Sequence, residues 1–91
     1  MKNVTLTICL TLAAEQGVAR SQYNLGRMYH QGLGVPQNYV YAHMWWHIAA
    51  SSGNTWASNE RDRVAKKMTP TQIAEAQNLA HECVRKKFKG C

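Results

Sequence analysis

The chain has 91 residues, which is enough for one small folded domain and too few for two. Hydrophobic residues make up 45% of it and charged residues 18%, a balance that excludes an intrinsically disordered protein. The formal net charge of +6 makes acidic partners worth considering. Much of this charge lies in residues 61–67 and 84–90, where cations suit solvated helix faces and helix C-termini.

The N-terminal residues have one lysine followed by an apolar run from Val4 to Ala14, interrupted by threonines. The run is too short to cross a membrane. Its basic region is too small for a convincing signal peptide. The sequence therefore leaves the cytoplasm, the periplasm and secretion open as locations.

An internal repeat explains this segment better. The letters AAEQG at residues 13–17 recur as AASSG at 49–53, thirty-six positions later, a spacing typical of stacked helix pairs. The second copy ends an apolar stripe with helical spacing, made of Ala42, Trp45, Trp46, Ala49 and Ala50. One period earlier the stripe is Leu6, Cys9, Leu10, Ala13 and Ala14, which are all apolar. Residues 3–16 are therefore predicted to be the second helix of a partial repeat.

Residues 18–53 are predicted to form one full repeat. Its first helix has an apolar face with Leu25, Met28 and Tyr29, and Gly26 allows a neighbouring helix to approach closely. The turn residues of QGLGVPQN end this helix. Asn38 is the predicted N-cap of the second helix, which starts at Tyr39, whereas Gly53 ends that helix and Asn54 caps the next one.

Residues 54–89 are predicted to be a divergent capping helix pair. Thr69 as N-cap, Pro70 at the first helical position and Gln72 in a capping box mark the start of the last helix. Its predicted buried face consists of Ile73, Ala76, Ala80, Cys83 and Val84, with Leu79 and Phe88 beside it. No segment has the alternation typical of a strand, so the expected fold is all-α.

These patterns resemble the Sel1-like repeat family, relatives of the tetratricopeptide repeats. The resemblance rests on QYNLGRMY at 22–29, GLGVPQNY at 32–39 and the stripe that follows. The matching signature residues are Leu25, Gly26, Tyr29, Gly32, Gly34, Pro36, Ala42, Trp45, Trp46, Ala49, Ala50 and Gly53. The resemblance implies that residues 1–91 form a single domain, a short solenoid of helix pairs with a C-terminal capping helix. The segment MTPTQIAEAQNLA is similar to the last helix of some bacterial members.

The chain departs from the family pattern at both ends. Arg61 stands where the pattern has leucine and Asp62 where it has glycine, so a second regular repeat is not completed. The helix at 3–16 lacks the first helix of its own repeat. Either it packs irregularly on the body, or a second copy of the chain covers it in a homo-oligomer.

The sequence contains no assembled catalytic or metal site. His43 and His47 are predicted to share a partly exposed face outside the stripe, and a metal would need a third ligand. His30 and His81 are further candidates only if the fold brings them close. We predict no metal, no cofactor and no enzymatic activity.

The cysteines leave their oxidation state open. Their number is odd, and none of the three lies within residues 18–53. A reduced chain, a Cys83–Cys91 bridge and an intermolecular disulfide at Cys91 are all compatible with the sequence. The disulfides that a cysteine-rich branch of the family forms within each repeat are therefore not expected here.

The resemblance implies recognition of a protein or peptide, as an adaptor, in a groove lined by the first helices of the repeats. The groove candidates outside the apolar stripe are Arg20, Tyr23, Asn24, Arg27, Gln31, Trp56, Glu60 and Arg63. Arg27 and Arg63 are one period apart, so they are predicted to lie in register, either as a pair of solvated arginines or as a pair that binds a carboxylate. The alternative is a basic nucleic-acid or anionic-surface binding protein, although no reader motif is present.

Overall fold

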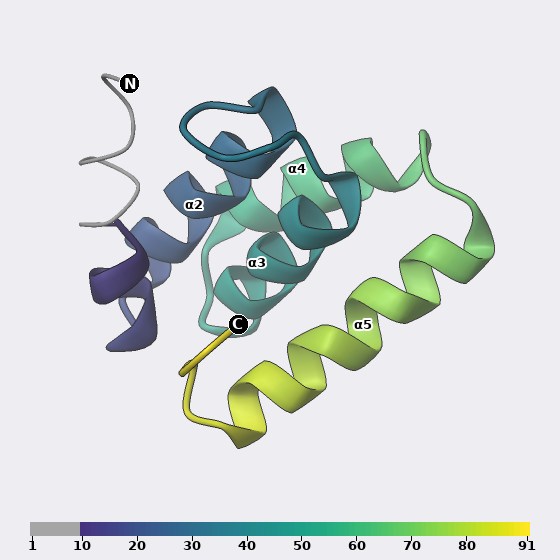
Figure 1. Ribbon diagram of the computed structural model, residues 1–91. Helices are drawn as coiled ribbons and strands as arrows, with labels where there is room; N and C mark the ends of the chain where they lie inside the picture. Colours follow the sequence, from purple (N-terminus) through teal and green to yellow (C-terminus); the bar gives the residue numbers. More distant parts are fainter. Residues whose placement is uncertain (1–9) are drawn as a thin grey trace.

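The structure is a computed structural model that describes residues 10–91 (Figure 1). Within this range the chain forms helices and no strand, which confirms the all-α prediction. Helical residues 10–15 precede α2 (Ala19–Gln31), α3 (Tyr39–Ser51), α4 (Thr55–Ala65) and α5 (Pro70–Arg85). Leu6 and Cys9 of the predicted N-terminal stripe lie outside the described residues, whereas Ala14 is fully buried.

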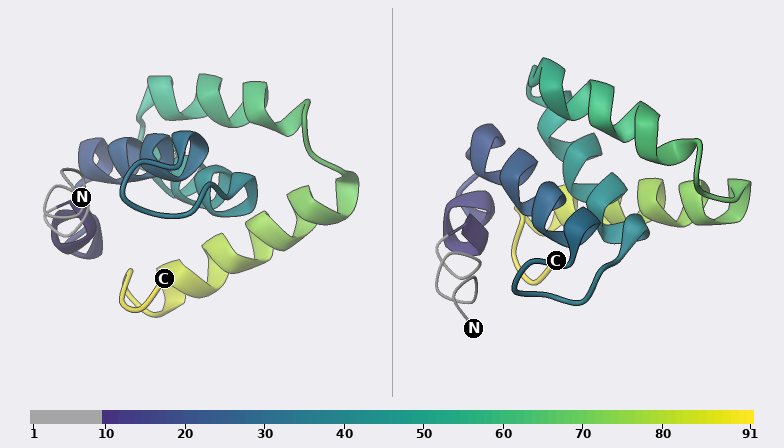
Figure 2. Two further views of the ribbon diagram at one scale, coloured as in Figure 1. Left: turned by 45° about the horizontal axis from the view of Figure 1, so that its top comes forward. Right: turned by 90° about the horizontal axis from the view of Figure 1, so that it is seen from above.

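Helix α3 is the centre of the fold because α2, α4 and α5 all pack against it. In the left view of Figure 2, α4 and α5 lie on opposite sides of α3. The buried residues of α3 are Ala42, His43, Met44, Trp45, Trp46, Ile48 and Ala49. A helix that is apolar on most of its circumference requires such neighbours, so α3 is held from several directions at once.

Gly26 sets the distance between α2 and α3. A Cβ atom at this position would lie 2.6 Å from Cδ1 of Trp46, so the indole of Trp46 packs directly on the α2 backbone. The indole Nε1 donates a hydrogen bond of 3.0 Å to the carbonyl oxygen of Tyr23. The close approach that the sequence predicted is therefore confirmed, and Leu25 and Met28 are buried beside it.

The connections between the helices have the predicted caps. Gly32 ends α2 in the left-handed conformation with φ 71°, which glycine adopts without steric cost. The Oδ1 atom of Asn38 accepts a hydrogen bond from the Tyr41 amide at the start of α3. Asn54 accepts one from the Ala57 amide at the start of α4. These side-chain caps fix where each helix starts and hence the register of the pairs.

The buried face of α5 is narrower than predicted. Ala76, Ala80 and Cys83 are buried as expected, and Ile73 is half-buried. Val84 is 50% exposed, so its predicted burial is wrong. The reason is that α5 packs mainly against α3, and one partner helix covers only a narrow stripe of another.

Thr69 provides a direct test of how α5 starts. Its side chain accepts a hydrogen bond from the Gln72 amide, and the Gln72 side chain accepts one from the Thr69 amide. We expect Thr69→Ala to lower the free energy of unfolding by about 1 kcal/mol in urea denaturation, because a helix N-terminus loses its cap. Thr71→Ala, at an exposed site in the same turn, is the control and should cost nothing.

Candidate functional site

A surface pocket of about 310 Å³ opens between α2 and α4. Arg20, Tyr23, Asn24 and Arg27 line it from α2, and Trp56 lines it from α4. All of these residues belong to the set that the sequence predicted for a groove. The structure therefore brings together two consecutive first helices, as the thirty-six-residue period implies. We call this site the α2–α4 pocket.

An aromatic pair forms one wall of the α2–α4 pocket. The rings of Tyr23 and Trp56 have centroids 6.0 Å apart and are tilted by 47°. Trp56 is 63% exposed, which is unusual for the largest apolar side chain. The backbone of Tyr23 is anchored in turn by the buried indole of Trp46. The pocket thus presents an apolar surface on a backbone fixed by the core.

The remaining groove candidates do not line the pocket. Gln31 is exposed at the end of α2, and Arg63 forms an ion pair of 2.9 Å with Glu60 on α4. The proposed joint action of Arg27 and Arg63 therefore stays a prediction, and part of the Arg63 charge is balanced by Glu60. The lining itself contains two guanidinium groups and no carboxylate.

The histidines are arranged differently from the prediction. His43 is 2% exposed, so the partly exposed face assigned to it is wrong. The rings of His43 and His47 are stacked with centroids 6.2 Å apart, and His81 of α5 is stacked on His47 at 6.3 Å. The sequence could not show that α5 would bring the third ring. We call these three residues the histidine row.

Two members of the histidine row, His43 and His47, are held in an environment that disfavours protonation. Burial, reinforced by the charges of His47 and Arg61, lowers the pKa of His43 from 6.5 to about 4, and Asp62 offsets only part of this. Burial, followed by the charges of Arg61 and His81, also lowers the pKa of His47. No group of three or more His, Cys, Asp or Glu side chains in residues 10–91 could hold a metal ion.

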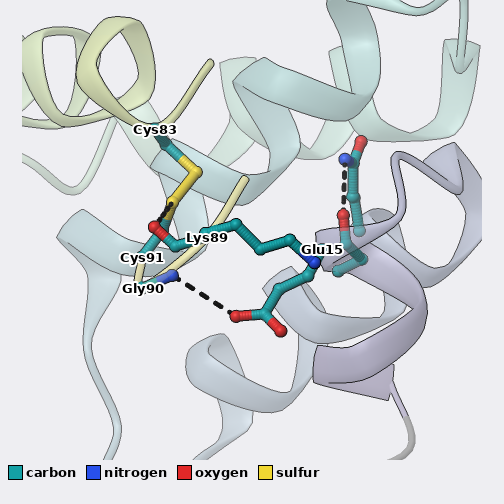
Figure 3. Close-up of a disulfide and its surroundings, with 7 residues drawn as sticks. Glu15, Cys83, Lys89, Gly90 and Cys91 are labelled. Atoms are coloured by element: carbon teal, nitrogen blue, oxygen red, sulfur yellow. Dashed lines mark hydrogen bonds between the residues drawn. A yellow bond between two sulfur atoms is a disulfide. The ribbon is translucent and has the colours of Figure 1, made fainter. Parts of the chain in front are cut away.

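The C-terminal residues resolve the question of the cysteines. Cys83 and Cys91 form a disulfide with Cα atoms 5.6 Å apart (Figure 3). The amide of Gly90 donates a hydrogen bond of 3.3 Å to Oε2 of Glu15. The C-terminus thus packs on the helical residues 10–15, although Leu12 there is 57% exposed. A homodimer through this helix stays a prediction.

The helices of residues 10–91 are too short or too polar to cross a membrane. The Trp45 and Trp46 side chains are each 1% exposed, so neither can stack on the bases of a nucleic acid.

Comparison with known families agrees with this architecture. The model of the Sel1 repeat matches residues 19–54, which span α2, the Gly32 turn, α3 and the turn at Gly53. Sel1 repeats generally mediate protein–protein interaction, and the repeat itself is non-catalytic. The helix pair, its packing on Gly26 and the family match together show that residues 19–54 form a Sel1 repeat.

Proposed function

We propose that the chain binds an extended segment of a partner protein in the α2–α4 pocket. The observation that supports this most is the exposed Trp56 beside Tyr23, between arginines that have no carboxylate next to them in the lining. Tryptophan, tyrosine and arginine are the residue types that dominate binding energy at protein interfaces. Their gathering on one surface therefore favours recognition of a protein.

The spacing of the arginines indicates what kind of segment fits. Arg20 and Arg27 are seven residues apart, so they lie on the same face of α2 about 10 Å from each other. An extended chain covers that distance in about three residues. The ligand is therefore a short segment with a carboxylate for one arginine and an apolar side chain for Trp56. The Asn24 amide is placed to bond its backbone.

Trp56→Ala and Arg27→Ala test this assignment. Partners captured from native lysate by the wild-type chain are identified first, and their binding segments are then measured as labelled peptides. We expect Trp56→Ala to weaken binding about 30-fold, equivalent to about 2 kcal/mol for an interface hot spot. Arg27→Ala should weaken binding less, and the remaining affinity should depend less on salt because one ion pair is lost.

Lys67→Ala is the matched control, since Lys67 is an exposed cation just beyond the end of α4 and does not line the pocket. It should bind like the wild type. Unchanged affinity in both pocket variants would contradict the proposal. Two results together would favour the anionic-surface alternative: affinity that falls steeply as salt rises, and a loss of affinity in Lys67→Ala as large as that in Arg27→Ala.

A further inference from the structure

The last residues of the chain form a strap that is closed by the disulfide. We define the strap as residues 86–91, which follow α5 and end at the bond between Cys91 and Cys83. Lys87 and Phe88 both have positive φ, at 55° and 66°. Non-glycine residues rarely adopt this conformation, and it persists only where the surroundings impose it. The strap is therefore a constrained segment.

The strap holds the N-terminal part of the described chain. The Phe88 ring lies 3.3 Å from the position that a Cβ atom of Gly17 would occupy. Phe88 and Cys91 pack against the core cluster that contains Ala14. The hydrogen bond from Gly90 to Glu15 joins residues that are 75 positions apart (Figure 3). The strap thus ties the two ends of the described chain together.

A side chain of α2 also contacts residues 10–17. Within the described part of the chain, the side chain of Gln22 donates a hydrogen bond of 3.1 Å to the Ala14 carbonyl. Ala14 is fully buried, whereas Leu12 is 57% exposed and Gln16 is exposed. The Phe88 ring and the Gly90 amide therefore act together with the Ala14 contacts to fix this segment on the body.

We propose that the Cys83–Cys91 bond is a redox-operated latch, opened at Cys91 by a dithiol reductant, whose opening releases residues 10–17 from the body. Cys83 is 1% exposed, so an attacking thiolate cannot reach its sulfur. Cys91 is only half-buried and is the accessible sulfur. Cys91 is therefore the site at which a mixed disulfide with the reductant forms.

The exchange takes place in two balanced steps. A thiolate of the dithiol attacks Sγ of Cys91, and the bond to Cys83 breaks while the Cys83 sulfur leaves as a thiolate and takes up a proton. The second thiol of the reductant then attacks the reductant sulfur that is bonded to Cys91 in the mixed disulfide. The Cys91 sulfur leaves as a thiolate and is protonated. The protein gains two electrons and two protons, and the dithiol becomes a disulfide.

The opening is local for a physical reason. Once the bond is broken, the strap keeps the helix-end hydrogen bonds of Lys87 and Phe88 but loses the covalent tether of Cys91 to α5, so its end can move and Phe88 can leave Gly17. A reduced Cys83 remains a small apolar residue that suits its buried position on α5. The packing of α5 on α3 does not depend on the strap and is retained.

Amide hydrogen exchange on the full-length chain tests the latch. The chain carries Cys9→Ser so that only one cysteine pair remains, and it is compared before and after treatment with dithiothreitol. The reporters are the amides of Gln16, Gly17 and Gly90, which are hydrogen-bonded in the closed form. We expect their exchange to accelerate at least about tenfold on reduction, while the amides of α3 keep their protection.

Two further variants distinguish the effect of the Cys83–Cys91 disulfide from the effect of the packing of Phe88 on Gly17. Phe88→Ala keeps the disulfide but removes the ring from Gly17, and it should accelerate exchange at Gly17 without reduction. Lys86→Ala, at an exposed position of the same strap, should leave exchange unchanged. Exchange within about twofold of the oxidised form after reduction would overturn the latch. Loss of protection throughout α3 would overturn it too, because the bond would then hold the whole fold. None of these readouts involves the α2–α4 pocket.

Discussion

Trp46→Ala is expected to lower the free energy of unfolding by about 3 to 5 kcal/mol, which is typical of a fully buried tryptophan. The side chain is 1% exposed and packs on Gly26. Truncation would leave a cavity between α2 and α3 and would remove the donor for the carbonyl of Tyr23. A domain of this size has a total stability of about 5 to 14 kcal/mol, so a large share would be lost. Urea denaturation followed by far-UV circular dichroism measures the change.

Trp56→Ala is the matched control for this substitution. It removes the same side chain at a position that is 63% exposed, where the indole pairs with the Tyr23 ring of α2. We expect it to change the free energy of unfolding by at most about 1 kcal/mol. A similar loss in both variants would contradict the central role assigned to α3. The same result also establishes that the pocket variant Trp56→Ala is folded when its binding is measured.

The features of the repeat that could be predicted are those that depend on local spacing. The stripe with Trp45 and Trp46 requires only the helical period, and the caps at Asn38 and Thr69 require only neighbouring backbone amides. Gly26 was predictable as a point of close approach because it is a residue without a side chain beside the apolar face of its helix. Such features do not depend on how the rest of the chain packs.

The errors arise where the chain leaves the regular repeat. The burial of His43 depends on what covers the outer side of α3, and no period specifies that. The exposure of Val84 likewise depends on how α5 packs, which is mainly against α3. The strap contact between Phe88 and Gly17 joins distant parts of the chain through two left-handed residues at the end of α5, where the sequence has no glycine to mark them. Contacts of this kind follow from tertiary packing alone.

The candidate site was predictable in part for the same reason. The period of thirty-six residues aligns α2 with α4, which is enough to place Trp56 near Tyr23. It does not determine which charges pair within a helix, and so it could not show that Arg63 binds Glu60. The α2–α4 pocket is therefore smaller than the predicted groove. It contains five of the eight predicted residues and leaves out Gln31, Glu60 and Arg63, which come later in α2 and α4.

The histidine row predicts that stability depends on pH. The fold lowers the pKa of His43 to about 4, whereas an unfolded histidine titrates near 6.5. Both states are neutral above pH 6.5, so the full stability is present there. As the pH falls from 6.5 towards about 4, the His43 imidazole is protonated in the unfolded chain but stays neutral in the folded chain. The free energy of unfolding therefore decreases over this range. Below the folded pKa the loss stops growing.

We expect this loss to reach about 3 kcal/mol for His43, because its side chain is 2% exposed and little screened by water. The groups that face it are His47 on its own helix and Arg61 and Asp62 on α4. Protonated His47 and Arg61 oppose a charge on His43, and Asp62 compensates too weakly. His81 on α5 acts on His47 in the same direction, so His43 and His47 both resist protonation.

Free energies of unfolding of the wild type and His43→Gln, measured in urea at about pH 7.5 and about pH 4.5, test this account. Carboxylates contribute equally to both chains, so the difference between the two slopes isolates the imidazole. The His43→Gln chain should lose less stability on acidification than the wild type. Met44→Leu, a buried neighbour without a titratable group, should lower stability at both pH values and keep the wild-type slope. Equal slopes in the wild type and His43→Gln would mean that the buried imidazole accepts a proton as readily in the fold as in water.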